Sequence, residues 1–344
     1  VVSDQALDEK TKLIANNIDK PAQNAVFVYD LSTLRASAFQ PHQTGFGVDQ
    51  NQLKQAIKNQ LAQLIQPETL LSEAQNSSQD QETTNIAVQM IIQQTEPEIS
   101  LKDTNNLGIN ELVGFGESYY TGSISTRSHN ITVASAKLNY ALVPPGEEFS
   151  FNKTVGPVTT ASGFKDAYVI RSGRTLLESG GGVCQVSSTM FRAMLDAGVN
   201  ITLRLPHSYR VSYYELENKP GFDATVYTGN VDLRFINDTP GYLLVVADAD
   251  PDRAYATVRI YGTSDGRHAE IGGYKQWGYT APPPPQDIPD PNLAPGQRKQ
   301  IENAIPGLKT SFDWTVFDQS GNIIHQKTFT SHYHAWGAKF LIGI

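Results

Sequence analysis

The chain of 344 residues is longer than one ordinary domain, and its 39% hydrophobic and 18% charged residues are typical of folded globular domains. A net charge of −8, with no cluster of Lys and Arg, excludes the basic face that nucleic-acid-binding proteins use to neutralise phosphates. No apolar run approaches the roughly 20 residues that cross a bilayer, so we expect two or three folded domains and no nucleic-acid partner.

The chain begins at Val1, without an initiating methionine, and polar residues follow where a signal peptide would be apolar. We therefore expect a mature form from which an N-terminal export signal or membrane anchor has been removed. Residues 1–19 place Leu7, Leu13 and Ile18 among charged residues in a helical pattern, which predicts a short helix.

Residues 20–105 predict a small α+β domain. Its first half holds two strand-like runs, AVFVYDL and TLRASAF. They precede VDQNQLKQAIKNQLAQLI, in which apolar residues recur about every 3.6 positions as in an amphipathic helix. The polar residues 67–82 predict a loop, and a strand is expected around 86–93.

Residues 106–265 predict a second domain that is rich in strands. The strand-like runs are NITVASAKLN, EEFSFN, AYVIRSG, ITLRLPHSYRVSYY, FDATVY, VDLRFIN, GYLLVVAD and ATVRIYG. One long helix interrupts them: it follows the run GGGVC, residues 180–184, and should end at Gly198.

The C-terminal part predicts a linker and a small module. The proline tract 281–295 cannot continue a helix or strand and predicts a polyproline-like spacer, within a linker of residues 266–295. Residues 296–344 contain KTSFDWTVFD and NIIHQKTFTSHY, which predict a hairpin. The predicted fold is α+β, multidomain and mostly antiparallel β, with a central helix that carries Cys184 at its N-terminus and a small β-rich C-terminal module.

Cys184 is the only cysteine of the chain and the first candidate for chemistry. A free cysteine is often only a small buried hydrophobe, but a lone thiol is unusual in an exported protein. At a helix N-terminus, the unpaired amides and the helix dipole favour thiolate over thiol. The amides of Cys184 and Gln185 are also placed to stabilise an oxyanion.

His207 and Asp223 follow on two strand-like runs that would meet as antiparallel neighbours. Together with Cys184 they form the pattern in which an imidazole takes the thiol proton and a carboxylate fixes the tautomer of the imidazole. Two alternatives stay open: His207 as an inert histidine, and Asp223 as a turn residue after Pro220-Gly221. A zinc site would need ligands at closer paired spacing, so we expect neither metal nor cofactor.

Five polar residues are candidates for substrate binding: Arg127, Gln185, Ser187, Ser188 and Arg204. The two arginines have the planar fork that binds a substrate carboxylate bidentately, although such arginines also form plain ion pairs. The other three lie in the first turns of the predicted helix, where partnership with backbone amides is the simpler role and substrate contact the second.

Several ordered motifs make residues 112–262 resemble the VanW family of bacterial cell-envelope proteins. These motifs are SISTRSHNITVASAKLN, VPPGEEFSFNKTVGP, ESGGGVCQVSSTMFRAMLDAGVNI, LRLPHSYRVSYY, GFDATV and DLRFINDT. Residues 20–98, especially GFGVDQNQLKQAIKNQL, are similar to a peptidoglycan-binding domain that often precedes VanW domains. The C-terminal hairpin is similar to extensions found in the same proteins.

The resemblance implies an extracytoplasmic protein of the cell envelope with peptidoglycan as its partner. Members of the family are associated with vancomycin-resistance clusters, and some VanW domains act as L,D-transpeptidases through a cysteine that corresponds to Cys184. His207 is carried over because it stands in the matching RxxH run, residues 204–207. The resemblance therefore favours cysteine-dependent acyl transfer on stem peptides. A non-catalytic peptidoglycan-binding protein linked to glycopeptide resistance, and a transglutaminase- or papain-like cysteine peptidase, stay open as alternatives.

Overall fold

The computed structural model describes residues 3–64, 87–171, 174–216, 218–229 and 231–344. These residues form two compact units, 1–27 with 39–104 and 28–38 with 105–344. The loop predicted at 67–82 lies outside the described residues. None of the described helices combines the length and the apolar character that crossing a membrane requires.

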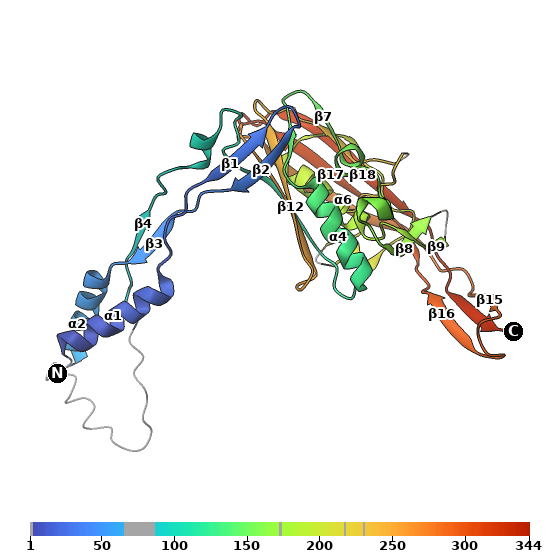
Figure 1. Ribbon diagram of the computed structural model, residues 1–344, viewed down its shortest axis with the longest axis horizontal. Helices are drawn as coiled ribbons and strands as arrows, with labels where there is room; N and C mark the ends of the chain where they lie inside the picture. Colours follow the sequence, from blue (N-terminus) through green and yellow to red (C-terminus); the bar gives the residue numbers. More distant parts are fainter. Residues whose placement is uncertain (1–2, 65–86, 172–173, 217, 230) are drawn as a thin grey trace, which may run out of the picture. The chain divides into compact units, whose positions relative to one another are not determined.

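The first unit is a small α+β structure. Its elements are α1 (Asp4–Ile18), β3 (Gly45–Val48), α2 (Gln50–Leu64), β4 (Ile92–Thr95) and the 3₁₀ helix η1 (Leu101–Thr104). The helix α1 begins after Ser3, whose hydroxyl accepts a hydrogen bond from the amide of Ala6 at 3.2 Å. Figure 1 shows α1 beside α2, and Ala15, Val48 and Leu53 form their shared core. The predicted helix 1–19 is therefore part of this unit, and β4 begins later than the predicted strand.

A six-stranded sheet organises the second unit, in the order β1-β2-β6-β12-β13-β5. The strands are β1 (Val26–Asp30), β2 (Arg35–Gln40), β5 (Glu111–Tyr119), β6 (Ala141–Val143), β12 (Leu243–Asp250) and β13 (Tyr255–Gly262). The first two residues of β1 and the last two of β2 belong to the first unit. The central strand β12 pairs antiparallel with β13 and β6, and β13 pairs antiparallel with β5.

Two helices of the second unit, α4 (Ser125–Leu138) and α6 (Val183–Ala197), lie side by side and pack against this sheet (Figure 1). The prediction of a strand at NITVASAKLN was wrong, because this run forms most of α4. Its Ile and Val favour strands locally. The residues Ile131, Ala134 and Leu138, however, recur at helical spacing and are fully buried.

Smaller elements complete the second unit. The additional strands are β7 (Glu148–Ser150), β8 (Asp166–Arg171), β9 (Arg174–Ser179), β10 (Asn200–Leu203), β11 (Arg234–Ile236), β14 (His268–Thr280), β15 (Gln286–Asp290), β16 (Arg298–Glu302), β17 (Gly307–Phe317), β18 (Ile323–Tyr333) and β19 (Lys339–Gly343). The short helices are α5 (Phe151–Val155), η2 (Thr160–Ser162) and η3 (Ser212–Tyr214). Most strand pairs are antiparallel, with β15–β19 parallel, so the predicted α+β, mostly antiparallel class is confirmed.

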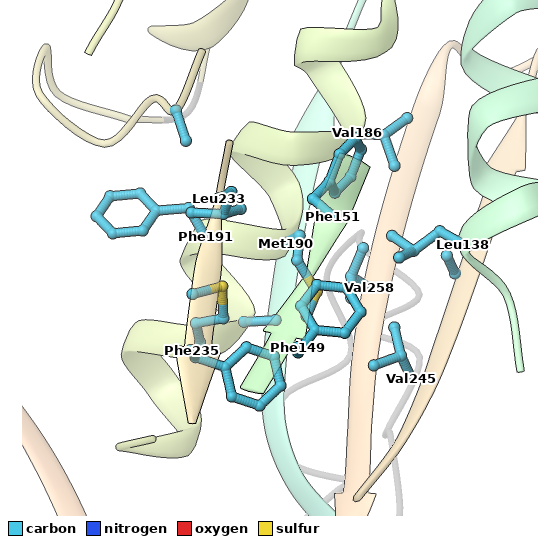
Figure 2. Close-up of a cluster of buried hydrophobic side chains, with 14 of the residues drawn as sticks. Leu138, Phe149, Phe151, Val186, Met190, Phe191, Leu233, Phe235, Val245 and Val258 are labelled. Atoms are coloured by element: carbon cyan, nitrogen blue, oxygen red, sulfur yellow. The ribbon is translucent and has the colours of Figure 1, made fainter. Parts of the chain in front are cut away.

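The helix α6 runs through the core of the second unit. Figure 2 shows its side chains Val186 and Met190 among aromatic and aliphatic side chains from the surrounding strands, including Phe149 and Phe235. Met190 has no exposed surface. A helix buried around most of its circumference is held in one position and can present its first turn rigidly.

The C-terminal hairpin belongs to the same core. The hairpin of β17 and β18 was predicted, but Phe312, Trp314 and Phe329 pack in one cluster with α6. The indole nitrogen of Trp314 donates to the carbonyl of Leu195 at 2.9 Å. The stretch 266–295, predicted as a linker, contains β14 and β15, and β14 pairs with β17. The run HAEIGGYKQWGYT contains three glycines, which are unfavourable in strands, so the sequence did not predict β14. The strand depends on its long-range pairing with β17.

Candidate active site

Cys184 lies in the first turn of α6, as predicted, and the helix ends at Gly198 in the left-handed conformation. The residue before the helix is Gly182, with φ of +115°. A Cβ there would lie 2.9 Å from the carbonyl oxygen of Arg127 and 3.1 Å from its Cγ. Only glycine therefore combines this backbone conformation with the close approach of α4, which fixes where α6 begins.

The structure brings His207 and Asp223 to Cys184. The His207 Nδ1 lies 2.6 Å from Asp223 Oδ2, and the same oxygen accepts the backbone amide of His207 at 2.7 Å. The Cys184 and His207 side chains shift each other's pKa values, so they lie close together. The Cys184 thiol donates to the carbonyl of Val226 at 3.5 Å. The structure thus brings the three predicted residues together, with His207 bound to Asp223 and close to Cys184.

The backbone that carries His207 and Asp223 differs from the prediction of adjacent strands. Both residues lie in irregular segments, and one backbone hydrogen bond of 2.8 Å, from Thr225 to Leu205, links the two. Pro206 has no amide to donate to a strand ladder, so the strand β10 ends before it. Side chains, rather than a sheet, hold the two segments together.

Burial and hydrogen bonding shift the pKa values of all three groups. Burial raises the pKa of Cys184, but the hydrogen bond and positive charge of His207 outweigh burial and hold it below its ordinary value. Burial lowers the pKa of His207, yet the bonds to Asp223 and Cys184 raise it to about 9. Against burial, His207 and Arg204 hold the pKa of Asp223 well below its usual range. These shifts all favour a thiolate–imidazolium pair backed by a carboxylate.

Arg204 and Tyr333 bind the carboxylate oxygen of Asp223 that does not contact His207. The Arg204 Nη2 lies 3.3 Å from Asp223 Oδ1, and the Tyr333 hydroxyl donates to the same oxygen. The Arg204 side chain is only 1% exposed, and it also donates to the Asp223 carbonyl at 2.7 Å and to Ser331 Oγ at 3.1 Å. The predicted role of Arg204 in substrate binding does not fit this position, because its donors are directed to protein groups around Asp223.

The three polar residues predicted on α6 are also directed inward. Gln185, Ser187 and Ser188 have no exposed surface. Ser187 and Ser188 donate to the carbonyl of Ala224 at 2.7 and 3.3 Å, so they hold the segment next to Asp223 against the helix. These side chains are therefore directed into the protein rather than into the cleft, and they bond to the carbonyls of Ala224 and Tyr119 and to Arg127 instead of the predicted first-turn amides.

The predicted pair of oxyanion donors is reduced to one. The backbone amide of Gln185 donates to the carbonyl of Gly182 at 2.9 Å and is engaged within the turn. The amide of Cys184 stands at the second position of α6, where a helix offers no carbonyl one turn earlier. Of the two amides, only that of Cys184 fits the predicted role of stabilising an oxyanion.

Cys184 and His207 lie on the wall of a cleft of about 880 Å³. The other lining residues include Arg127, Tyr209, Arg210, Tyr213, Tyr214, Tyr227, Asn303 and Ile305. Cys184 is partly exposed as a residue and lines the cleft. Arg127 is the one predicted substrate-binding residue that the structure places here. The part of the chain that the structure describes has no group of three or more His, Cys, Asp or Glu side chains placed to hold a metal ion.

Tyr214 and Tyr333 are site residues that sequence reasoning missed. The ring of Tyr214 stacks on His207, with centroids 4.5 Å apart and planes at 22°. The aromatic run HSYRVSYY beside His207 was a signal for such a contact. Tyr333 lies 110 residues from Asp223 in the chain and has no local signal.

The fold and the site together define an α+β protein with a Cys–His–Asp constellation on the wall of a cleft. The family model described as VanW like protein matches residues 126–261, which include all three residues. This stretch of the chain is therefore a VanW domain, and the resemblance seen in the sequence motifs is confirmed. The peptidoglycan-binding domain expected at residues 20–105 stays a prediction.

Two curated relatives match part of the chain. The uncharacterized protein YoaR of Bacillus subtilis is 41% identical over 130 residues, 38% of this chain and 42% of YoaR. The vancomycin B-type resistance protein VanW of Enterococcus faecalis is 32% identical over 133 residues, 38% of this chain and 46% of that protein. The matched region spans less than half the length of either relative.

Replacing Tyr333 by phenylalanine is expected to slow alkylation of Cys184 by iodoacetamide at neutral pH about tenfold. The change removes the hydroxyl that holds the Asp223 carboxylate in position and keeps the ring, so the carboxylate can turn away from His207 and the imidazolium loses part of the bond that raises its pKa. The pH profile of alkylation reports this shift. Tyr120→Phe is a matched control, because its buried hydroxyl donates to the Asp250 carbonyl outside the cleft lining. Identical profiles for Tyr333→Phe and wild type would exclude a positioning role.

Proposed function

We propose that the cleft is the active site of an extracytoplasmic, cysteine-dependent acyltransferase that acts on peptidoglycan stem peptides, in the manner of an L,D-transpeptidase. The observation that carries the proposal is the position of His207 between Cys184 and Asp223, with the pKa of the thiol lowered and that of the imidazole raised. The VanW domain, and the resistance named for the Enterococcus relative, support a cell-envelope substrate. The first unit would add affinity for peptidoglycan.

The proposed acylation begins with the thiolate of Cys184. Its sulfur attacks the carbonyl carbon of the scissile peptide bond, and the carbonyl electron pair moves onto oxygen to give an oxyanion. The amide of Cys184 and the positive end of α6 stabilise this charge. When the C–N bond breaks, the imidazolium of His207 gives its proton to the departing nitrogen, which leaves as a free amine. A thioester on Cys184 remains.

The proposed second half reverses the proton movement. An acceptor amine attacks the thioester carbonyl, and the neutral imidazole of His207 takes a proton from that nitrogen. The C–S bond breaks, and the sulfur leaves as the thiolate with which the cycle began. Asp223 keeps the imidazole in one tautomer and stabilises its charged form in both halves. Water as the acceptor would release an acid instead, and the same site would act as a peptidase.

The test is intact-protein mass spectrometry after incubation with a stem tetrapeptide. We expect an acyl adduct on Cys184 with release of the terminal residue, and a crosslinked product when an acceptor peptide is added. Cys184→Ala is expected to give neither. A wild-type protein that forms no adduct and releases nothing contradicts the proposal. If its thiol also reacts with iodoacetamide at pH 6 only after denaturation, the non-catalytic binding protein is favoured.

A further inference from the structure

Arg127, in the first turn of α4, is a buried cation on the cleft wall. Arg127 is only 8% exposed, and it lines the cleft. The Nη1 donates to Ser123 Oγ at 2.7 Å, and the Nη2 donates to Gln185 Oε1 at 2.8 Å. The guanidinium carbon lies 4.2 Å from the centroid of the Tyr213 ring. Among the described residues no carboxylate lies within ion-pair distance of it, so only neutral groups compensate its charge.

Arg204 and Arg210 differ from Arg127 because each of them pairs with a carboxylate. Arg204 is paired with Asp223. Arg210 lines the same cleft, but its Nε and Nη2 donate to the two carboxylate oxygens of Glu215 at 2.8 and 2.6 Å. Because a buried charge without a counter-charge is costly, an arginine that lacks one on a cleft wall favours an anionic ligand. A guanidinium has five donors, so its protein contacts leave donors available to a ligand.

Arg127 is also placed next to the reacting groups. Its Cγ packs against Gly182, and its Nη2 bonds to Gln185, so its contacts lie on both sides of Cys184 in the chain. Its guanidinium lies over the ring of Tyr213, and the ring of the next residue, Tyr214, stacks on His207. An anion held by Arg127 would therefore lie beside the thiol and the imidazole.

We propose that Arg127 is the subsite for a free carboxylate on the residue that leaves during acylation. One planar guanidinium, covered on one face by Tyr213, matches one planar carboxylate, whereas a phosphate dianion calls for more positive charge. The acyl donors are then peptides cut at their last bond, with the C-terminal carboxylate bound by Arg127. The acylation step in this inference rests on the proposed function; the anion subsite does not.

The subsite is tested with two alkylating reagents that differ in charge. Iodoacetate and iodoacetamide both place a CH₂ group on the Cys184 sulfur with loss of iodide, but only iodoacetate carries a carboxylate. The ratio of their rates is expected to fall about tenfold in Arg127→Gln, with the iodoacetamide rate preserved. Arg127→Lys should restore part of the ratio. Arg210→Gln, a cleft arginine already paired with Glu215, should leave the ratio within about twofold.

An unchanged ratio in Arg127→Gln overturns the subsite, and so does an equal loss of both rates, which would make Arg127 only a structural residue. The substrate class is tested with donor peptides that end in a carboxylate or in a carboxamide. Wild type should prefer the carboxylate in kcat/KM, and Arg127→Gln should lose that preference. Acylation without such a preference overturns the inference and leaves the proposed function intact. A shifted alkylation ratio with no acylation by either peptide leaves the anion subsite and removes the proposed reaction.

Discussion

Replacing Asp223 by asparagine is expected to lower the proposed acyl transfer by Cys184 about 10²- to 10⁴-fold. The carboxylate accepts both the Nδ1 proton and the backbone amide of His207, so it fixes the tautomer and the position of the ring. An amide at this position carries no charge to stabilise the imidazolium. The thiol loses ionisation in consequence, because its lowered pKa depends on the positive charge of His207.

The pH dependence of this variant distinguishes an electrostatic loss from a folding defect. In wild type the thiol ionises below its ordinary pKa, and His207 stays protonated up to about pH 9, so activity should rise on the acid side and fall near pH 9. Without the Asp223 charge the pKa of His207 moves down. The alkaline limb should then shift toward the ordinary histidine value of about 6.5. Initial rates from pH 5 to 10 measure both limbs.

Asparagine is the informative substitution because its amide oxygen can still accept a hydrogen bond from Arg204, whose side chain is only 1% exposed, whereas alanine would offer that guanidinium no acceptor. A matched control is Asp238→Asn, which removes a carboxylate 2.6 Å from His325 Nε2 and 3.0 Å from Arg267 Nη1, outside the cleft lining. The control should keep the wild-type pH profile. A fully active Asp223→Asn variant, with its alkaline limb still near pH 9, is the result that would remove Asp223 from the site.

The sequence predicts best the part of the site whose structure depends on residues close together in the chain. The run GGGVC implies a tight turn into a helix, and the helix repeat after it implies burial of one stripe, so the position of Cys184 needed no tertiary information. The C-terminal hairpin and most central strands follow from alternation in the same way. His207 and Asp223 were predicted as partners although the expected strands were not formed, because side-chain chemistry rather than sheet pairing joins them.

Long-range contacts explain what the sequence did not predict. Arg204 was expected at a substrate, but its direction depends on Ser331 and Tyr333, more than 100 positions further along the chain. The sequence alone does not distinguish Arg127 from Arg204 as candidates for binding a substrate carboxylate. Only the fold shows that Arg204 has a carboxylate partner and that Arg127 has none among the described residues. The helix α4 was missed because its buried stripe outweighs its local strand preference.

Replacing Gly116 by alanine is expected to lower the free energy of unfolding by about 3 kcal/mol. Gly116 lies in β5 directly beneath α6, which packs on that strand. A Cβ there would collide with the carbonyl oxygen of Thr189 and lie 2.6 Å from the backbone nitrogen of Ala193. Because both atoms belong to the helix backbone, no side-chain rotation relieves the clash, and the whole helix has to move.

The same displacement should reach the site, since α6 carries Cys184 in its first turn and is buried on most sides. Gly116→Ala should therefore slow iodoacetamide alkylation of the folded protein as well as shift its urea midpoint. Gly272→Ala is the matched control: this glycine also lies in a strand, β14, and a Cβ there meets no heavy atom within 4 Å. Its stability should change by less than about 0.5 kcal/mol. Equal stabilities for the two variants would mean that α6 is not held against β5 as closely as the active-site geometry requires.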